Sequence, residues 1–245
     1  MFDLSGKQAL VTGAGQGVGE GIAQALAHQG AAVLVNDVVT ERAESVANAI
    51  RAAGGSATAC PFDVTDLDAV RASISEMGEI DILVNNAGNA GADRMVVQSF
   101  REMEPSSWDG PIRVNLHGVL NCCKAVIDGM CERHWGRVIT ISSGAGTAGV
   151  RIGVSPYSAG KGGGIAFTRT LALEVARDGV TANTIAIGLM GVPDPTVTAS
   201  LAKGIPVGRT GAPPDIAAAC VWLASEEAAW VTGQTIQING GSVTT

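Results

Sequence analysis

The sequence predicts a doubly wound α/β fold, in which a parallel sheet of about seven strands carries helices on both faces, formed as a single domain over residues 1–245. Three observations predict it. Short runs rich in Val and Ile alternate with longer Ala-rich segments, 46% of the residues are hydrophobic, and the strand segments are apolar throughout. Strands that are apolar at every position are buried on both faces, as in a parallel sheet covered by helices.

The alternation places the elements in order along the chain. The predicted strands are Gln8–Thr12, Ala32–Asn36, Ala57–Pro61, Ile82–Asn85, Gly136–Ser142, Val180–Ile187 and Thr235–Ile238. The predicted helices are Gly17–Gln29, Thr40–Ala53, Leu67–Met77, Ser107–Arg133, Pro156–Asp178 and Pro214–Ser225. The segment Gly188–Gly211 is rich in Gly, Pro and Thr without periodicity, so we expect a long loop or small lid there, and such loops are usually functional.

Composition and charge disfavour several classes of protein. The formal net charge is −7 and no run of Lys or Arg occurs, so we expect neither a nucleic-acid partner nor an anionic membrane partner. The first residues lack a basic stretch followed by an apolar segment, so we expect no signal peptide. The apolar stretch 216–231 contains Glu226 and Glu227, which make it too polar to span a bilayer. We expect a cytoplasmic protein.

The five cysteines and three histidines show no metal-ligand spacing. An odd number of cysteines without a Cys-x-x-Cys pair is typical of free thiols in a reducing compartment. We therefore expect no protein-bound metal, and the chemistry must use other groups.

A glycine-rich turn follows the first predicted strand and leads into a helix. Residues Thr12–Gly19 read Thr-Gly-Ala-Gly-Gln-Gly-Val-Gly. Glycines let the backbone turn sharply and approach a pyrophosphate, whose charge is favoured by the helix N-terminus. The literal Gly-x-Gly-x-x-Gly pattern is absent, and the alternative is a turn without a ligand. The strand before it and the helix after it favour a dinucleotide site of the Rossmann type.

Asp37 directly follows the second predicted strand and lies 18 residues beyond Gly19, the last glycine of the turn. This is close to the spacing of about 20 residues at which an acidic residue binds the adenosine ribose hydroxyls. A 2′-phosphate there would face a carboxylate, and two like charges about 4 Å apart cost a few kcal/mol at an effective dielectric near 20. No Arg or Lys in the glycine turn or directly after Asp37 offsets this. These charges favour NAD over NADP as the cofactor. The alternative role for Asp37 is to act as the N-cap residue of the next helix.

These features, with four further motifs, resemble the short-chain dehydrogenase/reductase family over essentially the whole chain. The matching motifs are Thr12–Gly19, Asn85-Asn86-Ala87-Gly88, Asn115 within Val-Asn-Leu, Ser143 within Ile-Ser-Ser, and Tyr157-Ser-Ala-Gly-Lys161. Each motif alone is a modest signal, and Tyr-x-x-x-Lys alone is usually a solvated helix pair. All of them in the family's order are a strong signal.

The resemblance implies an NAD-dependent oxidoreductase and assigns site residues. The implied catalytic residues are Asn115, Ser143, Tyr157 and Lys161. The implied cofactor-binding residues are Gly13, Gln16, Gly17, Val18, Gly19, Asp37, Asp63, Val64, Asn86, Ala87, Gly88, Tyr157, Lys161 and Gly188. In the family, the serine holds the substrate oxygen, the lysine also binds the nicotinamide ribose, and the asparagine steadies a water that relays the proton.

The residues themselves support a tyrosine acid/base. A free tyrosine, with a pKa near 10, is a poor base at neutral pH, and a nearby ammonium stabilises its phenolate. Tyr157 and Lys161 are four apart and share one face of a helix, and Tyr157 is the only tyrosine in the chain. We therefore expect Lys161 to lower the pKa of Tyr157.

The chain departs from the family pattern at a few positions. Ile187 stands where the family carries proline before Gly188, and Val192 stands where a threonine contacts the nicotinamide carboxamide. The interval between Ser143 and Tyr157 is one residue longer than is common. Pro111 falls within a predicted helix, where it is tolerable only near the start. The departures affect the expected nicotinamide contacts and substrate pocket.

The expected reaction is the NAD-dependent interconversion of a small apolar secondary alcohol and its ketone. The alternative in the same class is an NADPH-dependent 3-oxoacyl thioester reductase, which Asp37 disfavours. A cofactor-binding sensor without catalysis, and an epimerase or dehydratase, fit less well. Arg94 and Arg151 are either partners for a carboxylate or thioester phosphate, or solvated surface residues.

The helix that carries Tyr157 contains an unusual glycine run, Gly162–Gly164, beside Gly160. Each interior helical glycine costs about 0.8–1 kcal/mol relative to alanine, so a close neighbour is expected there. Core packing is one explanation. The family commonly forms homotetramers, and we expect a homotetramer or homodimer in which a partner helix packs against these glycines.

Overall fold

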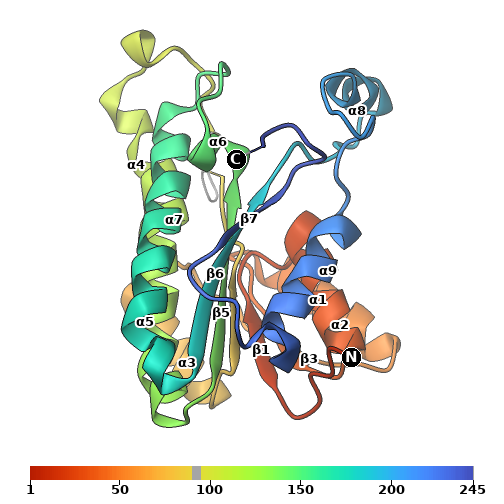
Figure 1. Cartoon of the computed structure of the whole chain (residues 1–245), viewed down its shortest axis with the longest axis vertical. Helices are drawn as coiled ribbons and strands as arrows, with labels where there is room; N and C mark the ends of the chain where they lie inside the picture. Colours follow the sequence, from red (N-terminus) through yellow and green to blue (C-terminus); the bar gives the residue numbers. More distant parts are fainter. Residues whose placement is uncertain (90–94, 245) are drawn as a thin grey trace.

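The computed structural model describes residues 1–89 and 95–244. Seven strands form one parallel sheet in the order β3-β2-β1-β4-β5-β6-β7 (Figure 1). They are β1 (Gln8–Val11), β2 (Ala32–Val35), β3 (Ser56–Ala59), β4 (Ile82–Asn85), β5 (Gly136–Ser143), β6 (Val180–Ile187) and β7 (Thr235–Ile238). Each lies within two residues of its predicted bounds, and the doubly wound α/β fold is confirmed.

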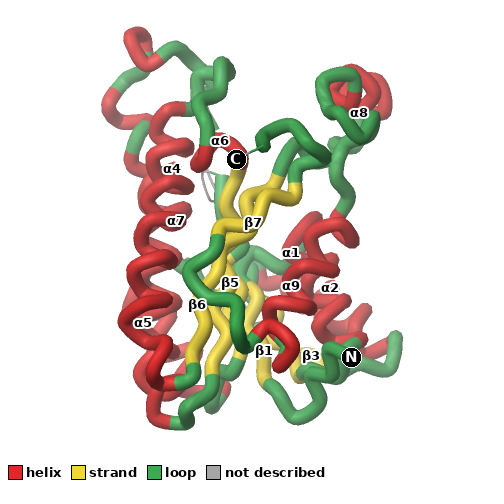
Figure 2. The backbone as a smooth tube through the Cα atoms, in the orientation of Figure 1, coloured by secondary structure: helices red, strands yellow, loops and turns green. Residues whose placement is uncertain are grey.

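The helices of the described residues form a layer on each face of the sheet (Figures 1 and 2). The α-helices are α1 (Gly17–His28), α2 (Thr40–Ala52), α3 (Leu67–Met77), α4 (Asp109–Ile112), α5 (Gly118–Glu132), α6 (Gly144–Thr147), α7 (Ser155–Val175), α8 (Pro195–Ala202) and α9 (Pro213–Ala224). The shorter turns are η1 (Phe100–Glu102), η2 (Pro105–Ser107), η3 (Arg113–His117), η4 (Ala176–Asp178) and η5 (Glu226–Ala228). Helices α1, α2 and α9 cover one face, and α3, α5 and α7 cover the other. No described helix is both long and apolar enough to cross a membrane.

The inner strands are buried on both of their faces, whereas the edge strand β3 exposes two of its residues and β7 is half-buried. In β1, Ala9 and Val11 pack in the layer of α1 and α9, whereas Leu10 between them packs in the layer of α3 and α5. Leu83 of β4 lies in the same layer as Leu10. All four side chains have no exposed surface, and each buried methylene contributes roughly 0.8 kcal/mol. Hydrophobic burial on both sides therefore holds the sheet.

The predicted helix 107–133 is interrupted by a π turn. Helix α4 leads into the π turn η3, which continues as α5. Pro111 is the third residue of α4. Proline is tolerated there because the N–H groups of the first turn have no hydrogen-bond partner within the helix, so the missing N–H of proline breaks no helical hydrogen bond. The wider π turn is the kind of local irregularity that often accompanies a functional site. It contains Asn115, whose Nδ2 donates to the Pro111 carbonyl oxygen over 2.7 Å.

The segment predicted as a loop over 188–211 contains helix α8. The Asp194 side chain accepts hydrogen bonds from the backbone of Thr196 and Val197, and Pro195 occupies the first helical position. An aspartate followed by proline is a recognised helix start. The prediction missed it because α8 has no fully buried residue, and hence no apolar periodicity.

The glycines of α7 contact other elements of the same chain. A Cβ atom added at Gly160 would lie 3.0 Å from the Pro111 oxygen and from the Asn115 Cβ. One added at Gly163 would lie 3.2 Å from the Leu116 side chain. Packing of α7 against α4 and η3 within the chain therefore accounts for these two glycines, and a partner helix beside the glycine run stays a prediction. The oligomeric state stays a prediction.

Candidate active site

A cleft of about 1270 Å³ opens at the carboxyl ends of the strands. It includes the point where β1 pairs with β2 on one side and β4 on the other, and this reversal of strand order is where ligands bind in such folds. Most of the residues predicted for the site line it. They are Gly13, Gln16, Gly17, Val18, Gly19, Asp37, Asp63, Val64, Asn86, Ala87, Gly88, Ser143, Tyr157, Lys161 and Gly188.

The glycine turn is packed against the end of β4. The Thr12 hydroxyl accepts hydrogen bonds from the backbone N–H groups of Asn86 and Ala87, both over 3.0 Å. Gly13 has a φ of +60°, and a Cβ atom there would lie 2.8 Å from the Ala87 Cα. Gly17 also has positive φ, but an added Cβ there would meet nothing within 4 Å. The turn thus leaves open backbone before α1, which fits a dinucleotide pyrophosphate.

Asp37 closes the turn from the other side. The side chain is 5% exposed, and its two oxygens accept from the N–H groups of Gly15 (3.2 Å) and Val39 (2.9 Å). Val39, and not Asp37, is the N-cap residue of α2. The carboxylate therefore holds the glycine turn against the end of β2. This is the place in the fold where the adenosine ribose of a dinucleotide binds.

Arg42 is a cleft residue that the sequence reasoning missed. It lies in the first turn of α2 and lines the cleft. An added Cβ at Gly15 would be 2.6 Å both from the Arg42 Cβ and from an Asp37 oxygen. Only the positions directly after Asp37 were considered for a compensating cation. The available signal was the predicted helix start at Thr40, which brings its first turn back toward the glycine turn.

Ser143 and Tyr157 lie together in the cleft. Ser143 ends β5, and its hydroxyl accepts from the Ala145 N–H over 3.2 Å, as the N-cap of α6. Tyr157 lies in the first turn of α7. Burial raises the pKa of Tyr157 above its ordinary value, and a hydrogen bond with Ser143 opposes this rise. The tyrosine is therefore protonated at neutral pH.

Lys161 is a buried ammonium that does not act on Tyr157 as expected. Burial lowers the pKa of Lys161 to about 8. Its Nζ donates to the Ile141 carbonyl oxygen over 2.7 Å and lies 6.0 Å from the centre of the Tyr157 ring. The expectation that this ammonium lowers the pKa of Tyr157 is not met, because burial of the phenol is the larger effect and Lys161 is directed at the sheet.

Asn115 is buried behind the cleft. It is 1% exposed, and its Nδ2 donates to the carbonyl oxygens of Pro111 (2.7 Å) and Asn89 (2.5 Å). Its Oδ1 has no hydrogen-bond partner among the described residues. A Cβ added at Gly88 would lie 3.1 Å from this Oδ1 and 3.1 Å from the Lys161 Nζ. Glycine at position 88 thus keeps a polar space open between Asn115 and Lys161.

Other parts of the cleft were predicted less well. Val192 does not line it, whereas Leu189 and Met190 do. Arg94, considered for a substrate carboxylate or thioester phosphate, lies outside the described residues. The sequence reasoning missed a set of residues before α4, within it and near the C-terminus, namely Met95, Ser106, Asp109, Arg113, Asn239, Ser242 and Val243. No local pattern marks these positions, because only the fold brings them to the cleft.

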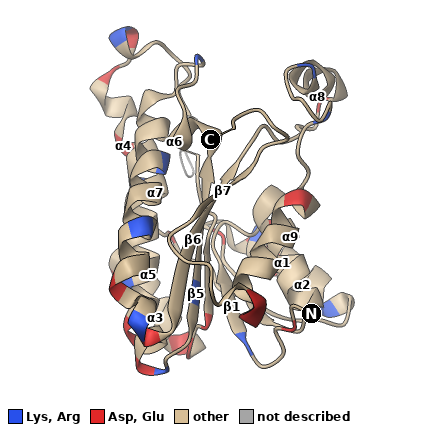
Figure 3. Ribbon diagram, viewed as in Figure 1, with Lys and Arg blue, Asp and Glu red and all other residues tan. Residues whose placement is uncertain are grey.

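Charged residues lie mostly on the outer helices and turns (Figure 3). Within the described residues, the buried charged side chains are Asp37, Lys161 and Arg137. Arg137 is held by Glu226 at 3.2 Å, whereas Asp37 and Lys161 both line the cleft without an ion pair. Buried ionisable groups without partners are typical of functional sites. The described residues contain no group of three potential metal ligands.

Comparison with known proteins defines the class. The family model described as short chain dehydrogenase matches residues 7–199. The chain is 40% identical over 250 residues to the 3-oxoacyl-[acyl-carrier-protein] reductase of Vibrio harveyi, with 98% of each chain covered. It therefore belongs to the short-chain dehydrogenase/reductase family, and is an oxidoreductase that acts on CH–OH or keto groups with a nicotinamide nucleotide.

Solved structures of the same class superpose closely. A 3-oxoacyl-[acyl-carrier protein] reductase with bound NAD from Brucella melitensis has a TM-score of 0.93 and 33% identity, over 99% of this chain and 94% of that one. A gluconate 5-dehydrogenase from Burkholderia cenocepacia, in complex with NADP and tartrate, has a TM-score of 0.90 and 36% identity, over 98% and 96%. The family resemblance in the sequence is confirmed.

Proposed function

We propose that the protein interconverts 3-oxoacyl and 3-hydroxyacyl thioesters, with NAD(H) as its preferred cofactor. The observation that carries this is the grouping of Ser143, Tyr157 and Lys161 in one cleft with the glycine turn and Asp37. The similarity to 3-oxoacyl reductases supports the thioester alternative over the small apolar alcohol or ketone first expected. The 3-hydroxyacyl product is itself a secondary alcohol, so the reaction type is unchanged.

Each site residue has a separate role in the reduction. When bound, the reduced nicotinamide supplies a hydride for the C3 carbonyl carbon of the substrate. Ser143 holds the carbonyl oxygen by a hydrogen bond, and Tyr157 gives this oxygen the proton from its own hydroxyl. The product is the C3 alcohol. The ammonium of Lys161 resupplies the proton to Tyr157 through water in the space at Gly88, where the unpaired Oδ1 of Asn115 accepts a hydrogen bond from that water.

The raised pKa of Tyr157 favours the direction in which Tyr157 donates a proton, which is reduction of the ketone. A group that must donate a proton works best when it is protonated at the operating pH. Burial keeps the phenol of Tyr157 in that form. Oxidation of the alcohol instead requires the phenolate, which burial disfavours. The site is therefore better suited to a reductase at neutral pH, with oxidation becoming faster as the pH rises.

The preference for NAD(H) is inferred from Asp37. A 2′-phosphate on the adenosine ribose would approach a buried carboxylate whose two oxygens are already fixed by backbone N–H groups. Arg42 beside it is exposed and lies in the same part of the cleft, so it offsets part of this repulsion. We therefore expect NADH to be preferred and NADPH to be used more slowly.

The test is a steady-state comparison of the purified protein with acetoacetyl-CoA and with simple ketones such as cyclohexanone, each with NADH and NADPH. We expect acetoacetyl-CoA to have a kcat/KM at least tenfold above that of any simple ketone, and NADH to be at least tenfold better than NADPH. Reduction of simple ketones without reduction of any 3-oxoacyl thioester would overturn the substrate assignment. A preference for NADPH would overturn the cofactor assignment alone.

A further inference from the structure

Two apolar rims border the cleft beside the residues assigned to the cofactor and the acid/base. One rim is the segment 148–154 between α6 and α7, and the other is the segment 187–190, which begins at the last residue of β6 and includes Gly188 of the cofactor set. Three of their apolar side chains are strongly exposed, Val150 by 41%, Ile152 by 55% and Leu189 by 48%. Exposed apolar side chains that line a cleft are typical of a surface that a ligand covers.

Backbone contacts hold each rim in place. In the first rim, the Gly153 carbonyl oxygen accepts from the Gln98 N–H over 2.9 Å, and a Cβ added at Gly153 would lie 2.6 Å from the Gln98 oxygen. In the second, the Leu189 oxygen accepts from the Gly211 N–H over 2.9 Å, and Met190 pairs with Gly211 in a parallel bridge. The exposed side chains therefore stand on backbone that is already positioned.

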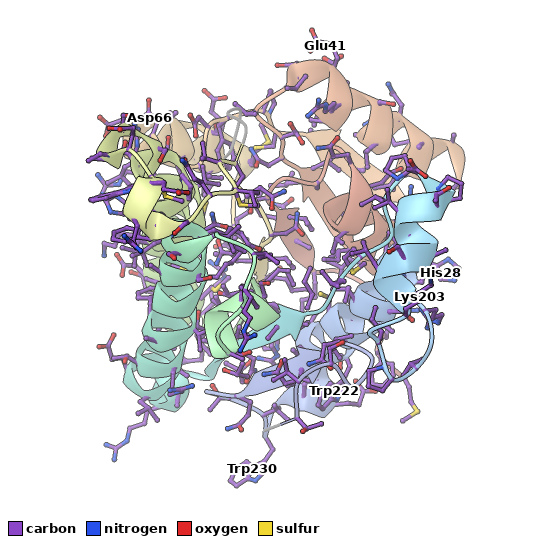
Figure 4. The ribbon with its side chains drawn as sticks, turned by 90° about the horizontal axis from the view of Figure 1, so that it is seen from above. His28, Glu41, Asp66, Lys203, Trp222 and Trp230 are labelled. Carbon is purple, nitrogen blue, oxygen red and sulfur yellow. The ribbon has the colours of Figure 1, made fainter. Side chains whose placement is uncertain are left out.

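The scarcity of charged side chains on the rims limits the chemical class of ligand that they can bind. Of the rim residues that line the cleft, Arg151 is the only charged one. A substrate arm that carries several hydroxyls or carboxylates would find few partners here, whereas an alkyl arm would find apolar contacts on both sides. Trp230, which is 99% exposed, projects from the surface (Figure 4) and does not line the cleft.

We infer that the two rims hold the acyl chain of the substrate, so that the protein acts on medium-chain thioesters of about eight to ten carbons in preference to four-carbon ones. This rests on the proposed function. The alkyl carbons beyond C3 lie between Val150 and Ile152 on one side and Leu189 on the other, and the thioester arm leaves by another route. Burying one methylene is worth about 0.8 kcal/mol, which is about fourfold in kcat/KM when it is complete.

The experiment measures kcat/KM with NADH for 3-oxoacyl-CoA substrates of four, six, eight and ten carbons. We expect a rise of about two- to fourfold for each added methylene up to eight carbons. A flat or falling dependence would overturn the inference while leaving the proposed function intact, provided that the four-carbon thioester is reduced. Failure to reduce any of these thioesters would instead count against the proposed function.

Surface variants identify the residues responsible. We expect Ile152→Ser and Leu189→Ser each to lower the ratio of kcat/KM for eight carbons over four carbons by at least threefold. The matched control is Leu173→Ser, because Leu173 is 76% exposed on α7 and does not line the cleft. The control should keep the wild-type ratio. All three positions are exposed, so the thermal midpoints of the variants should match that of the wild type.

A second set of substrates separates the acyl arm from the thioester arm. N-acetylcysteamine thioesters carry the same acyl chains as the CoA substrates but lack most of the carrier arm. If the rims hold the acyl chain, Ile152→Ser lowers the chain-length ratio equally in both series. If the rims hold the carrier arm, Ile152→Ser lowers kcat/KM for the CoA series alone and the chain-length ratio does not change, which overturns the inference.

Discussion

The two ends of the cleft are built in different ways. At the cofactor end, the buried side chains of Thr12, Asn36 and Asp37 and the half-buried side chain of Asn86 bond the glycine turn and its neighbouring strand ends. Asn36 also bonds the carbonyl oxygens at the end of β3, both over 3.0 Å. At the substrate rims, backbone bonds set the position of the loops while the apolar side chains face solvent. The first end is held by side-chain hydrogen bonds without a ligand, and the second, under the proposal above, is covered by the acyl chain of the substrate.

This difference means that the two ends should respond separately to substitution. A change at the cofactor end should alter nucleotide binding or selectivity and leave the choice of acyl chain unchanged. A change at the rims should do the reverse. Tyr157 and Lys161 lie where the two ends meet, and substitutions there should affect the chemical step itself.

The largest effect is expected for Tyr157→Phe. The substitution removes the hydroxyl proposed as the proton donor and keeps the ring, so kcat should fall by about 10²–10⁴-fold, the range for general acid catalysis. The dissociation constant for NADH, measured by its fluorescence on binding, should change by less than about threefold. Retention of a tenth or more of the wild-type kcat would contradict the assignment of Tyr157. Loss of NADH binding would show that the two ends are not separate.

A second effect concerns the stability associated with Lys161. Its pKa is lowered to about 8 in the folded protein, from about 10.4 in an unfolded chain. Below pH 8 the folded state must hold a buried ammonium, at a cost of up to about 3 kcal/mol. As the pH rises from 8 to about 10.4, the folded protein loses this proton before the unfolded chain does, so the cost disappears. The stability contributed by this group therefore rises with pH across that window.

The variant Lys161→Met tests this directly. It removes the ammonium and the hydrogen bond to Ile141, which is worth about 1 kcal/mol. We expect its free energy of unfolding in urea to exceed that of the wild type by about 1–2 kcal/mol at pH 7, with the gain lost by pH 10, while kcat falls. A variant that is less stable than the wild type at pH 7 would show that Lys161 supports the fold and is not a buried charge kept for catalysis.

The same contrast explains how much the sequence could predict. The inner strands and most helices followed from the apolar pattern, because strands that are buried on both faces require apolar side chains at every position. The glycine turn and Asp37 followed from backbone requirements that only a few residue types meet. By contrast, α8 and the cleft residues near Asn239 carry no such local requirement, since half-exposed positions accept many side chains. The prediction for the pKa of Tyr157 had the wrong direction of shift, because the shift depends on burial of the phenol in the folded protein and not on the sequence spacing to Lys161.

The smallest effect, and the sharpest test of separation, is expected for Asp37→Ser. Removing the carboxylate removes the repulsion toward a 2′-phosphate and leaves Arg42 beside it, so the ratio of kcat/KM for NADH over NADPH should fall by about tenfold, which is about 1.4 kcal/mol. Arg42→Ala, the matched control, should move the ratio the other way, by about two- to fivefold, because its guanidinium is exposed and screened. The chain-length dependence for 3-oxoacyl-CoA should be the same in both variants as in the wild type. A changed chain-length dependence would mean that the glycine turn and the rims are coupled, and that the rims are positioned in part from the cofactor end.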